Sequence, residues 1–533
     1  MYGILIMVAL LTADAPNAAG VVRTPVVQKV PDPFDAVSWA VQDALALKSR
    51  QQSAAGCLYV WIGPENDPNV AKVNSLAVNS CLSSAESIVL PELTAGGRLL
   101  RWDTHKIAPN PQDHRRLIGV LNSLAKGEPF WHFDLAALNL PHATVPAFDW
   151  IDGQSYTRIS SIPTEATAKL YNILQAETGL LCPLVRADYM LRKISSTVQG
   201  GVYYEARGFV VYEHGKRRKL NEKEILAKLG ADAALSRKVR GDDRVGIVIS
   251  GVTAQARAIE FIQGAVGPVR LSYDRTSDNE NIKAHPIYNL LSVVEKADGK
   301  ETIFTLPNGL LGYIATNGQG ELVDEVPANI ATDHKTPVPH PARLYAPLSC
   351  IRCHGPEGGV RTCRNDVPRL LKDPEQLDAF ADLGGKGLTS AEVIDRIAGL
   401  YSGDFARRTR DARNHYADAV FVATRGMKPD EAAAAWANQF DRYWHDPVTA
   451  ERQLLDLGYA KPRSPQALAG TLQKILAKPE VDLLVHGQPA SAEDPLRPAP
   501  RLGIPIRRQD AERIQPESFR RAFQKRDVME VAP

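Results

Sequence analysis

Two cysteines and a histidine stand together at Cys350, Cys353 and His354, in the pattern Cys-x-x-Cys-His. If both cysteines lie on one turn of helix, their thiols point to the same side and can bond the two vinyl groups of a porphyrin. The next residue, His354, is rotated by about 100° and can bind iron as the proximal ligand. With six Cys and twelve His in 533 residues, the count expected by chance is roughly 0.0015. The pattern therefore predicts one covalently attached haem c.

Three other interpretations use the same residues. Zinc would be held by Cys350, Cys353 and Cys363, but the spacing offers no fourth ligand unless His340 or another histidine is added. A redox-active dithiol is normally found near a βαβ pattern, which this stretch lacks. The third interpretation is two ordinary buried thiols. Haem is the leading hypothesis, and the other three stay open.

A haem iron bound by His354 also needs a second axial ligand, or an open position if the site carries out ligand chemistry. Met427, in the same helical region, would give a His/Met pair, although it would serve equally well in packing. His285, in the segment NIKAHPI, would give a bis-histidine pair. His340 would reach the iron only if its loop folds back. The sequence does not choose among these ligands.

The composition is that of a folded protein with two to four domains. Hydrophobic residues make up 44% of the chain and charged residues 23%, without a long low-complexity tract. The formal net charge of +2 gives no reason to expect nucleic acid or an anionic membrane as a partner. A small cytochrome needs only about a hundred residues, so most of this chain is not haem pocket.

The first 19 residues predict a secretory signal peptide. An apolar run from Ile4 to Leu11 is followed by small residues that end at Ala18-Ala19. No Lys or Arg precedes the run, and it is too short to span a bilayer, which takes about 20 residues. A buried first strand is the alternative. Because bacteria attach haem c outside the cytoplasm, we expect a periplasmic or otherwise exported protein without a transmembrane span.

Four cysteines remain if haem takes the two of the motif. Four thiols allow three disulfide pairings, and the sequence cannot choose among them. We expect simple burial for each. They are Cys57, Cys81, Cys182 and Cys363.

Local patterns predict an α+β fold in which residues 20–295 form a mixed α/β domain of unknown role. A possible N-cap at Asp67 and a capping box, Asn221-x-x-Glu224, mark two helix starts. The expected helices are 34–48, a helix from 67 towards 81, 111–124, 163–174, 186–194 and a short one from 221 to 230. The expected strands are 57–61, 99–102, 245–250 and 269–273.

Residues 296–460 predict a hairpin followed by a mainly α-helical, cytochrome c-like haem region. Two strands, 302–306 and 311–315, flank Asn308-Gly309, whose residue types suit the positive φ angles of a tight turn. A proline-rich loop, 327–347, then leads to Cys350. The expected helices are one from the capping box Thr389-x-x-Glu392 to 400, then 405–423 and 429–444. Residues 461–533 predict a short helix, 464–477, and a proline-rich tail.

The segment IFTLPNGLLGYIATNGQGELVDEVPANIATD, followed by APLSCIRCH, resembles a group of uncharacterised exported bacterial proteins typical of planctomycetes. In that group a hairpin of the form LPNGLQGY leads through a proline-rich loop into a c-type haem site. The resemblance continues in LVRADY, VGIVISGVTAQARAIE, NENIKAHPI and DPVTAERQLLDLGY, and it covers residues 55–460. Leu311 stands where a Gln is usual. The resemblance implies a haem-carrying, electron-transferring protein without an established substrate, and it maps the haem residues onto Cys350, Cys353 and His354.

We therefore expect an exported c-type haem protein that exchanges single electrons with an unknown redox partner protein. Its redox potential would follow from the axial ligands and the burial of the haem. An electron carrier is expected rather than an enzyme, so no catalytic residue is assigned. Two alternatives stay open: a haem enzyme of the peroxidase or oxidase type with an open distal site, and a structural or sensory protein in which haem or zinc pins the fold.

Overall fold

The computed structural model of the chain describes residues 36–62, 67–127, 132–133, 145–146, 165–198, 200–214, 216–232, 244–247, 257–275, 294, 297–328, 330–331, 344–360, 365–375, 389–401, 405–445, 447–449, 464–475 and 505–507. These residues contain both helices and sheets, in an α+β fold as expected from the sequence. The predicted signal peptide, 1–19, lies outside them. None of the helices in these ranges combines the length and the apolar character needed to cross a membrane.

The first sheet has the strand order β2-β3-β1-β6. Strand β1 is antiparallel to β3 and parallel to β6. All five residues of β1, CLYVW, are buried, as expected for a central strand that is covered on both faces. The elements up to residue 206 are α1 (Ala36–Ser49), β1 (Cys57–Trp61), α2 (Pro68–Cys81), β2 (Glu92–Thr94), η1 (Ala95–Gly97), β3 (Leu99–Asp103), α3 (Thr104–Ile107), α4 (Pro111–Gly127), β4 (His132–Phe133), β5 (Val145–Pro146), α5 (Glu165–Thr178), β6 (Leu184–Arg186), α6 (Ala187–Ile194) and α7 (Tyr203–Ala206).

The start of α2 follows from its sequence. Asp67 is extended, and its side chain accepts a hydrogen bond of 2.8 Å from the backbone N–H of Asn69. Pro68 occupies the first helical position, where its missing N–H leaves no bond unmade. The predicted N-cap is therefore confirmed.

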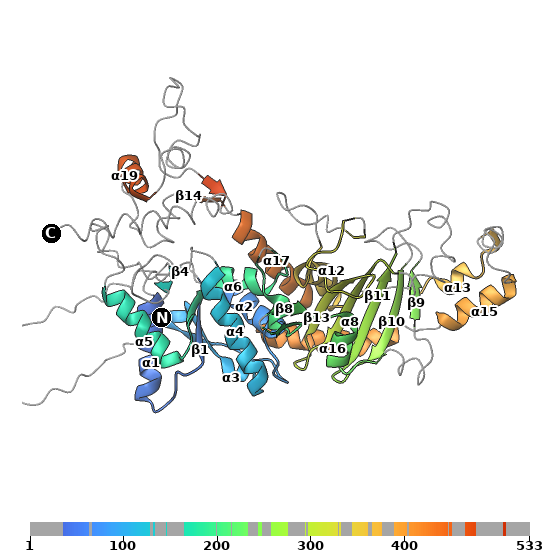
Figure 1. Cartoon of the computed structure of the whole chain (residues 1–533), viewed down its shortest axis with the longest axis horizontal. Coiled ribbons are helices and arrows are strands. Elements are labelled where there is room, and N and C mark those ends of the chain that lie inside the picture. The colour runs from blue at the N-terminus through green and yellow to red at the C-terminus, as the bar shows by residue number, and fades with distance from the viewer. Residues whose placement is uncertain are drawn as a thin grey trace, which may run out of the picture. The chain divides into compact units, whose positions relative to one another are not determined.

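The second sheet consists of five antiparallel strands in the order β13-β12-β11-β10-β9, which lie side by side in Figure 1. The hairpin predicted at 302–315 forms its edge, and the predicted strands 245–250 and 269–273 correspond to β9 and β11. Strand β10 was not predicted. The domain boundary expected between residues 295 and 296 falls between β11 and β12, which pair with each other, so strands from both sides of it share this sheet. Its strands are β9 (Arg244–Ile247), β10 (Arg257–Gln263), β11 (Pro268–Asp274), β12 (Gly299–Thr305) and β13 (Leu311–Asn317).

The turn between β12 and β13 has one of the two positive φ angles that Asn308-Gly309 predicts, because Asn308 is not left-handed. Gly309 has a φ of 84°, which a residue without a Cβ adopts at little cost. The side chain of Asn308 is buried, and its Nδ2 donates a hydrogen bond of 3.1 Å to the backbone oxygen of Asn79 in α2. The turn therefore also joins the second sheet to the helices of the first.

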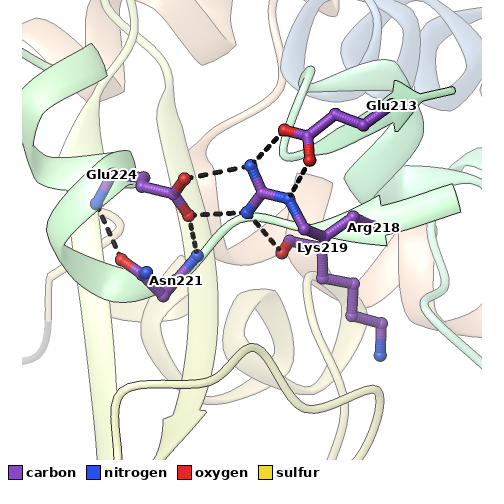
Figure 2. Close-up of polar contacts among 5 residues, drawn as sticks. All are labelled: Glu213, Arg218, Lys219, Asn221 and Glu224. Carbon is purple, nitrogen blue, oxygen red and sulfur yellow. Dashed lines mark hydrogen bonds and ion pairs between the residues drawn. The ribbon is translucent and has the colours of Figure 1, made fainter.

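A small hairpin, β7 (Val210–Glu213) and β8 (Lys216–Lys219), is tied to α8 (Glu222–Lys228) by one guanidinium. Arg218 lies between two carboxylates, with nitrogen to oxygen distances of 2.6 Å to Glu213 and 2.9 Å to Glu224 (Figure 2). Glu224 also accepts a bond of 2.8 Å from the N–H of Asn221, whose side chain accepts one from the Glu224 N–H. The predicted capping box is thus present, and it positions Glu224 for Arg218.

The remaining elements are mostly helices. The helix predicted at 405–423 has those bounds, and the capping box at Thr389 and Glu392 is present. Helix α17 packs against α2 and α6 as well as against α12, and its Trp436 Nε1 donates a bond of 2.9 Å to Ser195 Oγ. These elements are α12 (Leu348–His354), η4 (Gly355–Glu357), α13 (Val367–Leu370), α15 (Ser390–Leu400), α16 (Phe405–Ala423), α17 (Pro429–His445), β14 (Pro447–Thr449), α19 (Pro465–Ile475) and β15 (Pro505–Arg507).

Candidate functional site

The Cys-x-x-Cys-His motif lies on α12, a helix of seven residues. Cys350 and Cys353 are therefore separated by slightly less than one turn and lie on neighbouring positions of one helix face. Both are free thiols, and Cys350 is buried whereas Cys353 is half-buried. His354, the last residue of the helix, is 6% exposed. The local geometry that the haem hypothesis requires is present.

Two contacts hold α12 against α17. The guanidinium of Arg352 forms an ion pair with Asp441. Directly after the helix, a Cβ added to Gly355 would lie 2.6 Å from the Cβ of Ala433, so only glycine fits this close approach. The side of α12 that bears Arg352 is thus fixed to a neighbouring helix.

The second sheet presents charged side chains to the motif. In antiparallel pairs, residues directly opposite each other share a face of the sheet. Arg257 lies opposite Asp274, and Glu301 lies opposite Ser272, two residues before Asp274. Because residues two apart on a strand share a face, Arg257, Asp274 and Glu301 point the same way. All three line one pocket together with Cys350, Cys353 and His354.

The imidazole of His354 is held by two side chains of the hairpin. Its Nε2 lies 3.3 Å from Oε1 of Glu301. Its ring stacks on that of Tyr313, with centroids 6.3 Å apart and planes inclined by 18°. The Tyr313 hydroxyl in turn donates a bond of 3.2 Å to the backbone oxygen of Gly359. The hairpin therefore fixes the orientation of the histidine.

Burial and nearby charges set the protonation states of His354 and Glu301. Burial lowers the pKa of His354, and Arg270 and Arg257 lower it further, although Glu301 acts in the opposite direction. For Glu301, burial alone would raise the pKa, but the charge and hydrogen bond of His354 when it is protonated, together with Arg270 and Arg257, outweigh burial and hold the pKa well below the ordinary value. The lowered pKa values favour an ionised Glu301 and a neutral imidazole at neutral pH.

Burial and a neighbouring carboxylate disfavour the thiolate form of Cys350. Burial raises its pKa well above the ordinary value, and the negative charge of Glu301 raises it further. Reactive cysteines of dithiol oxidoreductases have lowered pKa values, because the thiolate is the nucleophile. The environment of Cys350 thus argues against the redox-active dithiol.

The donor set fits a c-type haem, since two neighbouring free thiols and a buried imidazole stand at the required spacing. The pocket around them encloses a free volume of about 40 Å³, about enough for one water. A haem therefore requires the pocket to open, and iron at Nε2 requires the Glu301 carboxylate to leave that nitrogen. Two lining residues, Ala331 and Leu344, border the segment 332–343, which lies outside the described residues.

The other candidate ligands are placed as follows. Met427 is half-buried between α16 and α17, where its backbone N–H donates a bond of 3.0 Å to Thr424 Oγ1, and it does not line the described pocket. His285, His340 and Cys363 lie outside the described residues. No group of three or more His, Cys, Asp and Glu side chains arranged for a metal ion occurs in the described part of the chain.

The three described cysteines outside the motif are buried, as expected. Cys57, Cys81 and Cys182 are free thiols in the core. Burial raises the pKa of Cys57 to about 11, which keeps it protonated at neutral pH. These residues act as small apolar side chains.

Sequence reasoning missed Glu301, Asp274 and Arg257 as parts of the site. Glu301 lies one residue before the predicted strand 302–306, and in the structure it belongs to β12. A charged residue in a strand is ordinarily interpreted as solvent-facing. Glu301 lies opposite Ser272 and on the same face of the sheet as Tyr313. Only the register of the sheet shows this position, so the sequence alone offers no direct signal for it.

Comparisons with known proteins give no match from which a family could be assigned. No family model, curated protein or solved structure matches the chain.

Proposed function

We propose that this chain is an exported c-type haem protein that transfers single electrons. The observation that carries the proposal is the helical turn of α12, which brings two free, neighbouring thiols and an adjacent buried histidine into one pocket. Chance does not explain the sequence pattern, and the helix gives the pattern the geometry that it needs. A mainly helical, cytochrome c-like haem region, formed by α12 and the helices after it, is part of the proposal.

The chain's own residues have distinct roles in this proposal. Cys350 and Cys353 form the thioether bonds, and His354 is the proximal ligand. Bound haem supplies an iron centre that gains and loses one electron. Glu301 contacts the Nε2 that would bind iron, so in the haem-loaded chain its carboxylate would leave that nitrogen. Arg257 and Asp274 neutralise each other behind it.

The test is expression of the full chain with a c-type maturation system. Haem should stay on the chain in denaturing electrophoresis, and the pyridine haemochrome band should have the c-type position. Replacing Cys350 or Cys353 singly with alanine should leave one thioether and shift that band, whereas the double replacement should abolish attachment. His354→Ala should keep the covalent haem but change its ligation and therefore its spectrum.

A matched control is Cys182→Ala, which removes a buried free thiol outside the motif. It should leave haem attachment unchanged. A haem that washes out in acid acetone would contradict the proposal, as would one equivalent of zinc without iron. Electron transfer further predicts a six-coordinate low-spin spectrum that carbon monoxide does not change, whereas a high-spin haem that binds carbon monoxide indicates the enzyme or the sensor.

A further inference from the structure

A second pocket, which we call the Lys72 pocket, lies among α2, the strands β2 and β3, and the end of α16. Its free volume is about 390 Å³, within the range of small-molecule binding sites. Apolar side chains form most of its wall, among them Ile62, Ala71, Leu93 and Leu100. Leu93 is 50% exposed, so an apolar surface is open to a ligand here. No residue of the candidate haem site lines it.

Two cations stand at this apolar wall. Lys72 projects from α2, and Arg425 follows the end of α16. Arg425 Nη2 donates a bond of 3.1 Å to the backbone oxygen of Pro91. Within the described ranges neither cation pairs with a carboxylate. Two positive charges without a counter-ion among the described residues, beside an apolar cavity, favour an anion that carries an apolar body.

The backbone position of Arg425 follows from the end of α16. The N–H of Arg425 bonds to the oxygen of Val422 at 3.2 Å, and the N–H of Gly426 bonds to the oxygen of Phe421 at 2.9 Å. These two bonds form a Schellman cap, in which the residue after the helix adopts the left-handed conformation, and Arg425 has a φ of 52°. The cap therefore fixes the backbone from which this guanidinium reaches the pocket.

We propose that the Lys72 pocket binds an amphiphilic anion, with a hydrocarbon chain against Ile62, Ala71 and Leu100 and a carboxylate between Lys72 and Arg425. This inference does not depend on the haem proposal, since it uses different residues and a different pocket. The two cations select a negatively charged head group, and the apolar wall selects a hydrocarbon chain on the ligand.

The test is titration of the full chain with dodecanoate by isothermal calorimetry. One equivalent should bind, whereas butanoate, dodecanol and dodecyltrimethylammonium should bind at least about tenfold more weakly, because each lacks either the chain or the negative charge. Lys72→Met should weaken dodecanoate about tenfold, as expected for loss of one charged hydrogen bond. Ala71→Trp should fill the cavity and abolish binding.

Arg425→Gly separates binding from folding. Glycine is the residue that this left-handed cap position favours, so the unfolding temperature should stay equal or rise, while dodecanoate affinity falls about tenfold. The matched control is His214→Gly, because His214 also has a left-handed φ, of 51°, and does not line this pocket. It should leave affinity unchanged. Equal binding of dodecanol, or dodecanoate binding that survives both Lys72→Met and Ala71→Trp, would overturn the proposal.

Discussion

Replacing Arg257 with methionine removes one side of a buried ion pair behind the candidate haem site. Its Nε and Nη2 donate to the two carboxylate oxygens of Asp274 at 2.7 and 2.8 Å, and the side chains are only 8% and 7% exposed. Two unit charges about 4 Å apart attract by about 4 kcal/mol at an effective dielectric constant of 20. Loss of one partner of a buried pair costs about 3–5 kcal/mol. We expect Arg257→Met to lower the free energy of unfolding by that amount at pH 7, measured by urea denaturation.

The size of this loss should depend on pH. Burial already raises the pKa of Asp274, although Arg257 lowers it. Without Arg257 the pKa of Asp274 rises further, so the folded variant binds a proton at a higher pH than the unfolded chain does. Stability of the variant then falls as pH rises through this folded pKa, and it is regained as pH falls. The difference between variant and wild type should therefore shrink between pH 7 and the ordinary carboxyl range.

Two further variants check the cause. Arg217→Met removes an ion pair with Glu205 whose side chains are 46% and 20% exposed, and it should cost at most about 1 kcal/mol. The double replacement of Arg257 by methionine and Asp274 by leucine removes both charges and should recover most of the loss. A cost below about 1 kcal/mol for Arg257→Met, or a cost that stays constant as pH falls, would refute the reasoning.

Three other substitutions test the packing and the helix ends. Gly312→Ala would place a Cβ 2.2 Å from the ring of Phe304, so we expect a loss of about 1–3 kcal/mol or more in urea denaturation. Thr389→Ala removes a helix cap worth about 1 kcal/mol, and hydrogen exchange should become faster in residues 390–400 alone. Trp436→Phe removes the hydrogen bond to Ser195 and should cost about 1–3 kcal/mol, because a buried hydroxyl is left unpaired; an unchanged urea midpoint would contradict that contact.

Local signals predicted much of the fold. Helix α16 has the predicted bounds, and both capping boxes are formed, at Asn221 and at Thr389. Capping boxes and Asn-Gly turns work through bonds and backbone angles a few residues apart, so the sequence contains the whole interaction. The Cys-x-x-Cys-His motif on α12 is likewise a local pattern, because its side chains lie within about one turn of helix.

Strand β10 escaped prediction because charged residues hide its apolar pattern, although it forms a hairpin with β11 across residues 264–267. The segment RAIEFIQ carries Arg257 and Glu260, which interrupt its apolar pattern, yet both are buried. Asp274 forms an ion pair with Arg257, and the hydroxyl of Tyr273 donates a hydrogen bond of 2.8 Å to Glu260. Both partners come from the neighbouring strand β11. The charged side chains of the candidate site, Arg257, Asp274 and Glu301, were missed for a related reason. The contacts that neutralise them depend on the register of the sheet, which the sequence does not show.

The Arg218 contacts in Figure 2 also bear on how this surface meets other molecules. The run Lys216-Arg217-Arg218-Lys219 would, on sequence alone, suggest a basic patch that draws in polyanions. Glu205, Glu213, Glu224 and Asp324 lie against three of these cations. Four positive and four negative charges sum to zero, so beyond the Debye length of about 8 Å in physiological salt little field of either sign remains. An approaching anionic partner therefore gains no acceleration from this hairpin, and association here is governed by random collision and shape.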